Sequence, residues 1–333
     1  MRIIEIYNYS EIEESSLPES KALISKEQWD SDAPELHLIA TDGNNNLIGC
    51  CSLWWAATPL YEKQRTGYIG HFSVSNEQAG CQLLEIACRY LTSFNCQIAI
   101  GPINGNTWKS YRFITDNGNY PPFFLEFPFQ KVELSSFLNF GFKPLAQYES
   151  VLNTSLNWID GKIEAASESL NNEGFSLRSL NRDEIDDELS KIYALSLKCF
   201  NDNFLYSPIT LPSFLRLYAP IRTRLDPELI LLIEYHTELV AYIFAIPDFS
   251  QAQRGEVIDT VIIKTLAVDP KYSGRRLGSW LSQTLYHRVQ TKGFQKIIHA
   301  LMIQNNISRK MHSEDSRIIR KYTLFSFNLN VKK

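Results

Sequence analysis

Short strand-like runs and helical stripes alternate along this chain. Residues 259–268 are rich in β-branched and apolar side chains, as in a buried strand, and Asp269-Pro270 is a turn signal that ends it. Residues 296–303 predict a second strand. Between the two strands Gly293 marks a helix end, and apolar residues recur every four positions, as on one buried helix face, at Leu277, Leu281, Leu285 and Val289.

The same order of elements occurs earlier in the sequence. Residues 66–74 predict a strand, and residues 97–100 predict the next one, which ends in Gly101-Pro102. The helix between them has an apolar stripe formed by Leu83, Leu84, Ala87 and Leu91. Val74 and Val268 end the two corresponding strands 194 positions apart, which indicates a repeat of domain size.

Three further segments complete the predicted organisation. The polar stretch 157–174 predicts a helix that leads from one copy to the next, and residues 228–235 and 239–246 flank a short polar turn, as in a hairpin. Met1–Ser10 alternates apolar and polar residues, which predicts a first strand rather than a secretory signal. We therefore predict an α/β fold, a mixed sheet flanked by helices, in two domains, 1–155 and 175–333, joined by residues 156–174.

Composition narrows the class of protein. A chain of 333 residues exceeds the ~250–300 at which a single core stops growing, so two domains are expected. The net charge of −4 and the pI near 5.9 argue against nucleic acid as a partner, because phosphate-backbone binders gather Lys and Arg. The longest apolar runs are far below the ~20 residues of a membrane span. We expect a soluble, cytoplasmic protein without membrane contact.

The six cysteines are sparse and form no CxxC pair, so we expect reduced thiols. Only His37 lies near the adjacent Cys50 and Cys51. Because Cys and His do not converge at ligand spacing, no metal site is expected.

The loop after residue 268 carries the most specific chemistry. A glycine-bearing turn that leaves a buried strand and opens a helix presents free backbone N–H groups at the positive end of the helix dipole. Such a turn can bind a pyrophosphate, here on the main-chain amides between Ser273 and Ser279. The side chains of Arg275 and Arg276 can neutralise phosphate charge.

This stretch resembles the coenzyme A-binding motif of the GNAT superfamily of acyltransferases, [QR]-x-x-G-x-[GA] after a strand. The motif's last glycine is Gly278, whereas Ser273 replaces its first residue and Arg276 its middle glycine. The resemblance implies acetyl-CoA as acyl donor and a coenzyme A site made of Leu266, Ala267, Val268, Ser273, Gly274, Arg275, Arg276, Leu277, Gly278, Ser279 and Asn305.

The resemblance also suggests a catalytic acid. In the family an Asn follows the strand after the motif helix, and a Tyr seven residues later protonates the leaving thiolate. Here His312 stands seven residues after Asn305. Imidazolium can donate a proton near neutral pH, so His312 is the candidate acid, with a solvated surface histidine as the alternative.

The base that would deprotonate the amine is not assigned. The position of the family's strand Glu falls near Ile262, which cannot serve, and Asp259, Glu256 and Glu234 are the carboxylates nearby, each also readable as a solvated charge. The thioester carbonyl would be polarised by a backbone N–H near residues 266–268, without a special side chain.

The first half lacks the cofactor signature. Its loop at residues 75–80 is shorter, has no Arg and places Glu77 where phosphate would lie. Other segments resemble tandem GNAT proteins: 101–108 (GPINGNTW), 121–126 (PPFFLE) and 140–142 (FGF). By this resemblance, the loop at 101–108 together with Tyr111, Arg112 and Tyr120 would line an acceptor pocket. The alternative is a structural role, because a Gly-Pro turn is structural in most proteins.

We therefore predict a tandem protein with a degenerate first domain and a second domain that transfers an acetyl group to a small-molecule or peptide amine by direct attack on the thioester. Two alternatives stay open: a non-catalytic acyl-CoA-binding module, and a peptidyl transferase that uses aminoacyl-tRNA, against which the acidic balance counts. The sequence names neither the acceptor nor the oligomeric state.

Overall fold

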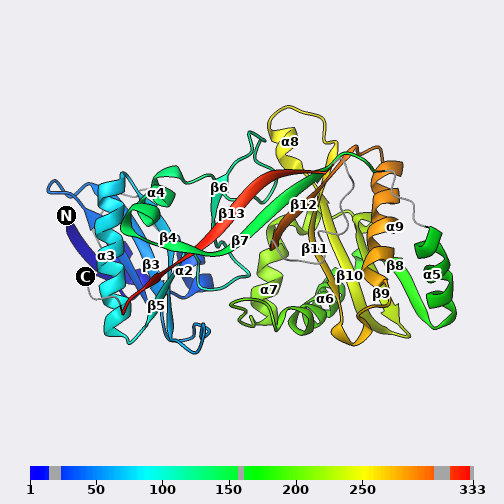
Figure 1. Cartoon of the computed structure of the whole chain (residues 1–333), viewed down its shortest axis with the longest axis horizontal. Coiled ribbons are helices and arrows are strands. Elements are labelled where there is room, and N and C mark those ends of the chain that lie inside the picture. The colour runs from blue at the N-terminus through cyan, green and yellow to red at the C-terminus, as the bar shows by residue number, and fades with distance from the viewer. Residues whose placement is uncertain (15–23, 157–160, 304–315, 331–333) are drawn as a thin grey trace.

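A computed structural model describes residues 1–14, 24–156, 161–303 and 316–330 of the chain (Figure 1). Within these residues, thirteen strands form one mixed sheet with the order β1-β2-β3-β4-β5-β13-β7-β12-β11-β10-β9-β8, and β6 pairs with β13 off this path. Helices flank the sheet in both halves, so the predicted mixed α/β fold with two similar units is confirmed. No helix of the described part is long and apolar enough to cross a membrane.

The first half contains the strands β1 (Arg2–Ile6), β2 (Leu36–Thr41), β3 (Leu47–Trp54), β4 (Thr66–Val74), β5 (Ile98–Gly101), β6 (Phe113–Asp116) and β7 (Lys143–Asn153). Its helices are α1 (Tyr9–Glu14), α2 (Lys26–Asp32), α3 (Glu77–Ser93) and α4 (Lys131–Phe140). The predicted first strand, the strand at 66–74 and the helix that follows it are confirmed.

The second half contains the strands β8 (Phe175–Ser179), β9 (Ile230–Tyr235), β10 (Glu238–Pro247), β11 (Thr260–Val268), β12 (Lys296–Ile303) and β13 (Arg317–Asn328). Its helices are α5 (Gly161–Asn172), α6 (Ile185–Phe200), α7 (Leu211–Tyr218), α8 (Phe249–Gln253) and α9 (Leu277–Thr291). The predicted joint helix, the hairpin and the strand-helix-strand order of β11, α9 and β12 are confirmed.

The two halves repeat one pattern of strand pairing. β4 is antiparallel to β3 and pairs in parallel with β5 from Thr66 and Ile98 onward. β11 is antiparallel to β10 and pairs in parallel with β12 from Thr260 and Lys296 onward. The 194-residue offset predicted from Val74 and Val268 therefore relates structurally equivalent strands.

The halves exchange strands at the centre of the sheet. β7, from the first half, pairs with β12 of the second, whereas β13, the last strand, pairs with β5 of the first. β7 and β13 also pair with each other, with Tyr148 opposite Tyr322. Figure 1 shows these two long strands crossing from one half to the other. The sequence did not predict this exchange, and the domain limits 1–155 and 175–333 stay a prediction.

Packing fixes which helices cover which face of the second half. α6 and α7 place Leu189, Ile192 and Phe214 in one core, together with Tyr242 and Phe244 of β10. The opposite face of β10 packs against α9, whose predicted apolar stripe is buried at Leu277, Leu281, Leu285 and Val289. In the first half α3 and α4 cover the corresponding face.

A buried ion pair locks the crossing strands to the loop before α4. Arg320 of β13 is 2% exposed and Glu126 is 1% exposed, measured on their side chains, and they form a bidentate pair at 2.6 and 2.8 Å. Arg320 also donates to backbone carbonyls of residues 117, 120 and 121, and the Tyr322 hydroxyl donates to Glu126 at 2.7 Å. All of these groups are satisfied by protein, as buried charges require.

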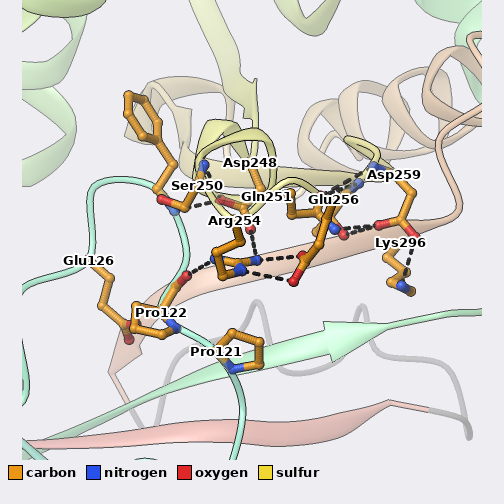
Figure 2. Close-up of polar contacts among 12 residues, drawn as sticks. Pro121, Pro122, Glu126, Asp248, Ser250, Gln251, Arg254, Glu256, Asp259 and Lys296 are labelled. Carbon is orange, nitrogen blue, oxygen red and sulfur yellow. Dashed lines mark hydrogen bonds and ion pairs between the residues drawn. The ribbon is translucent and has the colours of Figure 1, made fainter.

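A second contact joins the same loop to the second half (Figure 2). The Phe124 N–H donates to Asp248 at 2.7 Å, and Arg254 after α8 donates to the Pro122 carbonyl at 2.7 Å. Arg254 is itself held by Glu256 at 2.9 Å. The Pro-Pro-Phe-Phe-Leu-Glu segment that the sequence singled out is thus a structural joint between the halves.

Replacing Glu126 by Ala tests the buried pair. Removal of one partner leaves the Arg320 charge uncompensated in the core, so we expect the free energy of unfolding to fall by about 3–5 kcal/mol. Lys321→Ala, which removes the exposed pair with Asp116 at 3.8 Å, is the control and should cost under about 1 kcal/mol. Denaturant unfolding compares the two, and equal losses would contradict the role given to Glu126.

Candidate functional site

The two central strands of the second half diverge. β11 and β12 pair only from Thr260 to Ile263, where the last pair is Ile263 with His299. Both strands continue, to Val268 and Ile303, without pairing to each other. The strand edges beyond residue 263 therefore present backbone N–H and C=O groups that this parallel ladder does not use.

A bulge marks the start of this opening. Ala245 pairs with Ile263 and Phe244 with Thr265, so Lys264 is the extra residue of β11. Its side chain is exposed to solvent, yet desolvation by the surrounding protein lowers the pKa of its ammonium group. In the sequence, Lys264 is a single charge within an apolar run, and residue type alone does not single it out.

The loop between β11 and α9 is open to solvent. Residues 273–276 are exposed, Gly278 and Ser279 are half-buried, and Leu277 is buried in the core. Helix α9 starts after Arg276 without a side-chain cap, so the N–H groups of its first turn have no partner from a capping side chain. This geometry suits an anion at the start of α9.

Arg276 occupies a glycine-like backbone conformation. Its φ is 64° and that of Gly274 is 81°, both in the left-handed region. The resemblance aligned Arg276 with the motif's middle glycine, so the backbone shape of that position is retained although the residue differs. Left-handed geometry costs an L-residue about 1–2 kcal/mol.

The two arginines of the loop are not equivalent. Arg275 forms an ion pair with Glu173 at 2.8 Å, and both side chains are about half exposed. Arg276 donates weakly, at 3.5 Å, to the carbonyl of Lys162. Arg276 is therefore the more available of the two for a bound anion.

The remaining predicted residues divide into two groups. Ala267 is buried in the core beneath α6, and Leu266 and Val268 pack partly buried on the side of α9, so all three offer mainly backbone groups. Asn305 and His312 lie outside the described residues. The structure thus brings together the β11 end, the loop and the first turn of α9.

The carboxylates considered as bases are already engaged. Burial raises the pKa of Asp259, but hydrogen bonds from Gln251, Lys296 and Thr260 outweigh it and hold the pKa below its usual value. Ile262 is buried, as expected of a core position. Ion pairs hold the three acids: Asp259 with Lys296 at 2.7 Å, Glu256 with Arg254 at 2.9 Å, and Glu234 with Arg178 at 2.6 Å.

The corresponding opening in the first half is filled by protein. The side chain of Asn104 accepts the His71 N–H of β4 at 2.8 Å, and the Ile103 N–H donates to the Ile69 carbonyl at 2.9 Å. A Cβ added to Gly70 would lie 2.2 Å from the Ile103 oxygen. The loop after β5 therefore occupies the space that a thioester would need.

The N-terminus of helix α3 is also covered by protein. The Asn76 side chain accepts the Ala79 N–H at 2.9 Å, which caps the helix. A Cβ added to Gly80 would lie 2.1 Å from the Ser136 hydroxyl of α4, so α4 packs directly on the first turn. Glu77 is exposed there, as the sequence indicated. These features support the prediction that the first copy is degenerate.

A buried polar chain in the first half has the residue types of a hydrolase triad. His71 is 2.8 Å from Asp32 and 2.9 Å from the Ser52 hydroxyl, which is 2.7 Å from His37, and Lys109 pairs with Asp32. Ser52 is 0% exposed and lies between two imidazoles, so no substrate can reach it. Burial, with the nearby His71, lowers the pKa of His37 to about 3. We assign these hydrogen-bonded side chains a structural role.

No disulfide links the six cysteines, all of which belong to the described residues, and burial raises the pKa of the Cys50 thiol to about 12. Among the residues placed by the structure, no group of three His, Cys, Asp or Glu side chains could hold a metal ion.

Comparison with known proteins relates this geometry to one family. Residues 189–314 match the model of the acetyltransferase (GNAT) family. This segment includes most of α6, the strands β9 to β12, the open loop and α9. No curated protein shows significant sequence similarity to the chain.

Several solved structures share the fold along nearly the whole chain. A GNAT protein from Anabaena variabilis matches with a TM-score of 0.57 and 9% identity, over 99% of this chain and 73% of that one. A tandem GNAT protein from the clavulanic acid pathway matches with a TM-score of 0.50 and 10% identity, over 100% of both. A glucosamine N-acetyltransferase region of a fungal multi-domain β-N-acetylglucosaminidase matches with a TM-score of 0.51 and 13% identity, over 98% of this chain. This chain spans 38% of that fungal protein.

Arg276→Gly tests the left-handed position. Glycine adopts this conformation without steric cost, so we expect the free energy of unfolding to rise by about 0.5–1 kcal/mol. Arg275→Gly is the control: residue 275 is not left-handed and loses its pair with Glu173, so stability should fall. Denaturant unfolding measures both, and a loss of stability in Arg276→Gly would contradict the strain.

Proposed function

We propose that the second half of this chain, in which residues 189–314 match the model of the acetyltransferase (GNAT) family, transfers an acetyl group from acetyl-CoA to an amine. The first half, whose equivalent site is filled, would support the fold and the acceptor side. The proposal includes the coenzyme A residues predicted from the sequence, with Asn305 and His312 retained as predictions.

One observation carries the proposal: the divergence of β11 and β12 lies beside an exposed, uncapped start of α9. The opening offers backbone N–H groups that can polarise a thioester carbonyl. The loop at 273–279 offers N–H groups and Arg276 for the pyrophosphate. In the first half β4 and β5 also separate, after the pair Tyr68–Ile100, but the loop after β5 fills that opening and the Asn76 side chain caps α3.

Lys264 supplies a group able to take the proton of the attacking amine. It sits in the bulge where the strands separate, and desolvation lowers the pKa of its ammonium group, so the neutral amine forms more easily than on an ordinary lysine. The acceptor nitrogen would form the new bond to the acyl carbon, the carbon–sulfur bond would break, and the nitrogen's proton would pass to Lys264 directly or through water. No covalent enzyme intermediate is required.

An amine acceptor fits both the family and its neighbours. The fungal region is described as a glucosamine N-acetyltransferase, which acts on an amine of a small molecule. The net charge of −4 also fits a small acceptor better than a nucleic acid. Acceptor identity depends on the loops around the opening.

Gly278→Asp tests where acetyl-CoA binds. A carboxylate in the first turn of α9 would repel the pyrophosphate, so we expect the affinity measured by calorimetry to fall at least about tenfold. Wild type should bind one acetyl-CoA per chain.

The matched control is Ser75→Asp, which adds the same charge to the equivalent, exposed loop of the first half. This variant should keep the wild-type affinity. A loss in Ser75→Asp with none in Gly278→Asp would move the site to the other half, and no uptake by wild type would refute the proposal.

Lys264→Arg and Lys264→Met test the proton acceptor. Arginine keeps the charge but cannot deprotonate at accessible pH. In wild type, acetyl transfer should rise with pH as Lys264 loses its proton, through a range below the ordinary lysine pKa because the shift is downward. Both variants should lose this rise and about 10²–10⁴ in rate.

Acetyl-CoA affinity is the control for these two variants, since Lys264 lies outside the pyrophosphate loop, and it should change little. A pH profile that is the same in wild type and Lys264→Arg would exclude Lys264 as the base.

A further inference from the structure

A hairpin-like loop presents Arg112 at the junction of the two halves. Ile103 and Tyr111 form a β-bridge, and the Arg112 N–H donates to the Pro102 carbonyl at 2.8 Å. Arg112 has a φ of 78°, an unusual conformation for a residue with a side chain. Such strained positions persist where the surroundings fix them, and they cluster at functional sites.

The guanidinium of Arg112 is enclosed by aromatic rings. Its carbon lies 3.9 Å from the ring centre of Tyr111, 4.0 Å from that of Tyr148 and 5.8 Å from that of Tyr322. Arg112 is 7% exposed, and Tyr111 beside it is half-buried. The rings hold the planar group in one orientation while one side of the loop reaches solvent.

Part of the hydrogen-bonding capacity of this guanidinium is unused. Its Nε and Nη1 atoms are buried and have no hydrogen-bond partner among the described residues. Glu126, a buried acid of the same region, is already neutralised by Arg320 and accepts from the Tyr322 hydroxyl. Buried charges are ordinarily paired, so Arg112 is a cation whose hydrogen-bonding capacity is left for a ligand.

The position of Arg112 relates it to the opening of the second half. Tyr148, on which it stacks, lies on β7 and pairs with Ile303 of β12, the strand that diverges from β11. Leu301 of β12 packs against the same cluster as Tyr148 and Tyr111. The unpaired guanidinium therefore stands beside one wall of the opening whose other wall carries Lys264.

We propose that Arg112 binds a carboxylate group of the acceptor, so that the acceptor class is an amine that also carries a carboxylate. A planar guanidinium and a carboxylate match in a bidentate pair, and the aromatic rings exclude water from it. This inference rests on the proposed acetyl transfer, because it identifies the acceptor of that reaction.

The test uses three amino acids in which the distance between amine and carboxylate increases: glycine, 4-aminobutyrate and 6-aminohexanoate. Each is compared with its own carboxamide, which has no negative charge. Calorimetry with coenzyme A present measures binding, and acetyl transfer from acetyl-CoA measures turnover. We expect at least one amino acid of the series to bind and react better than its amide by about 10- to 100-fold.

Arg112→Gln should abolish this preference while leaving acetyl-CoA affinity unchanged. Arg112→Lys keeps the positive charge but loses the planar guanidinium, so it should retain part of the preference. This second variant keeps the proposal testable if Arg112→Gln does not fold. Arg317→Gln, which removes an exposed arginine over the Tyr120 ring, is the control and should keep the full preference.

The outcomes separate the two proposals. Wild type that takes up acetyl-CoA but binds every amide as well as its amino acid, or binds no member of the series, would overturn the carboxylate site alone. A preference that survives in both Arg112 variants would also overturn it. Wild type that does not take up acetyl-CoA would overturn the acetyl-transfer function itself.

Discussion

The pairing of β7 with β13 is the constraint on which the rest of the structure depends. Each of these strands is the interior neighbour of a strand from the opposite half, so the sheet has no break between the halves. A sheet interrupted there would expose long unpaired edges on both sides. The buried Glu126–Arg320 pair fixes the crossing to the loop that follows β6.

The same scaffold serves two purposes in one chain. Both copies have a strand, a helix and a parallel strand in the same order, but in the first copy Asn104 and α4 occupy the places that remain open in the second. Filling these spaces stabilises the first copy and removes its binding surface. The first copy in turn contributes β7, Tyr148 and the Arg112 loop to the surroundings of the second. The open half is thus completed by side chains of the closed one.

Local patterns predicted the elements well because each depends on neighbours in sequence. The stripe at Leu277, Leu281 and Leu285 and the β-branched run before Val268 were sufficient for α9 and β11. The strand exchange was not predictable in this way, since nothing within β13 states which strand it will pair with. The residue type at position 276 does not predict that Arg276 keeps a glycine's backbone shape, which only coordinates reveal. The roles proposed for Lys264 and Arg112 rest on a bulge and on three tyrosine rings, which are tertiary features.

The order in which the chain is synthesised gives the strand exchange a further meaning. β5 and β7 are complete by residue 153, whereas their shared partner β13 spans Arg317–Asn328. On the ribosome, at about 5–20 residues per second, β5 waits roughly ten seconds or more for β13. During this time the edge of β5 that β13 covers and both edges of β7 are unpaired, and such edges invite pairing with other chains. Folding of the first half is therefore coupled to a strand that is synthesised only after most of the second half.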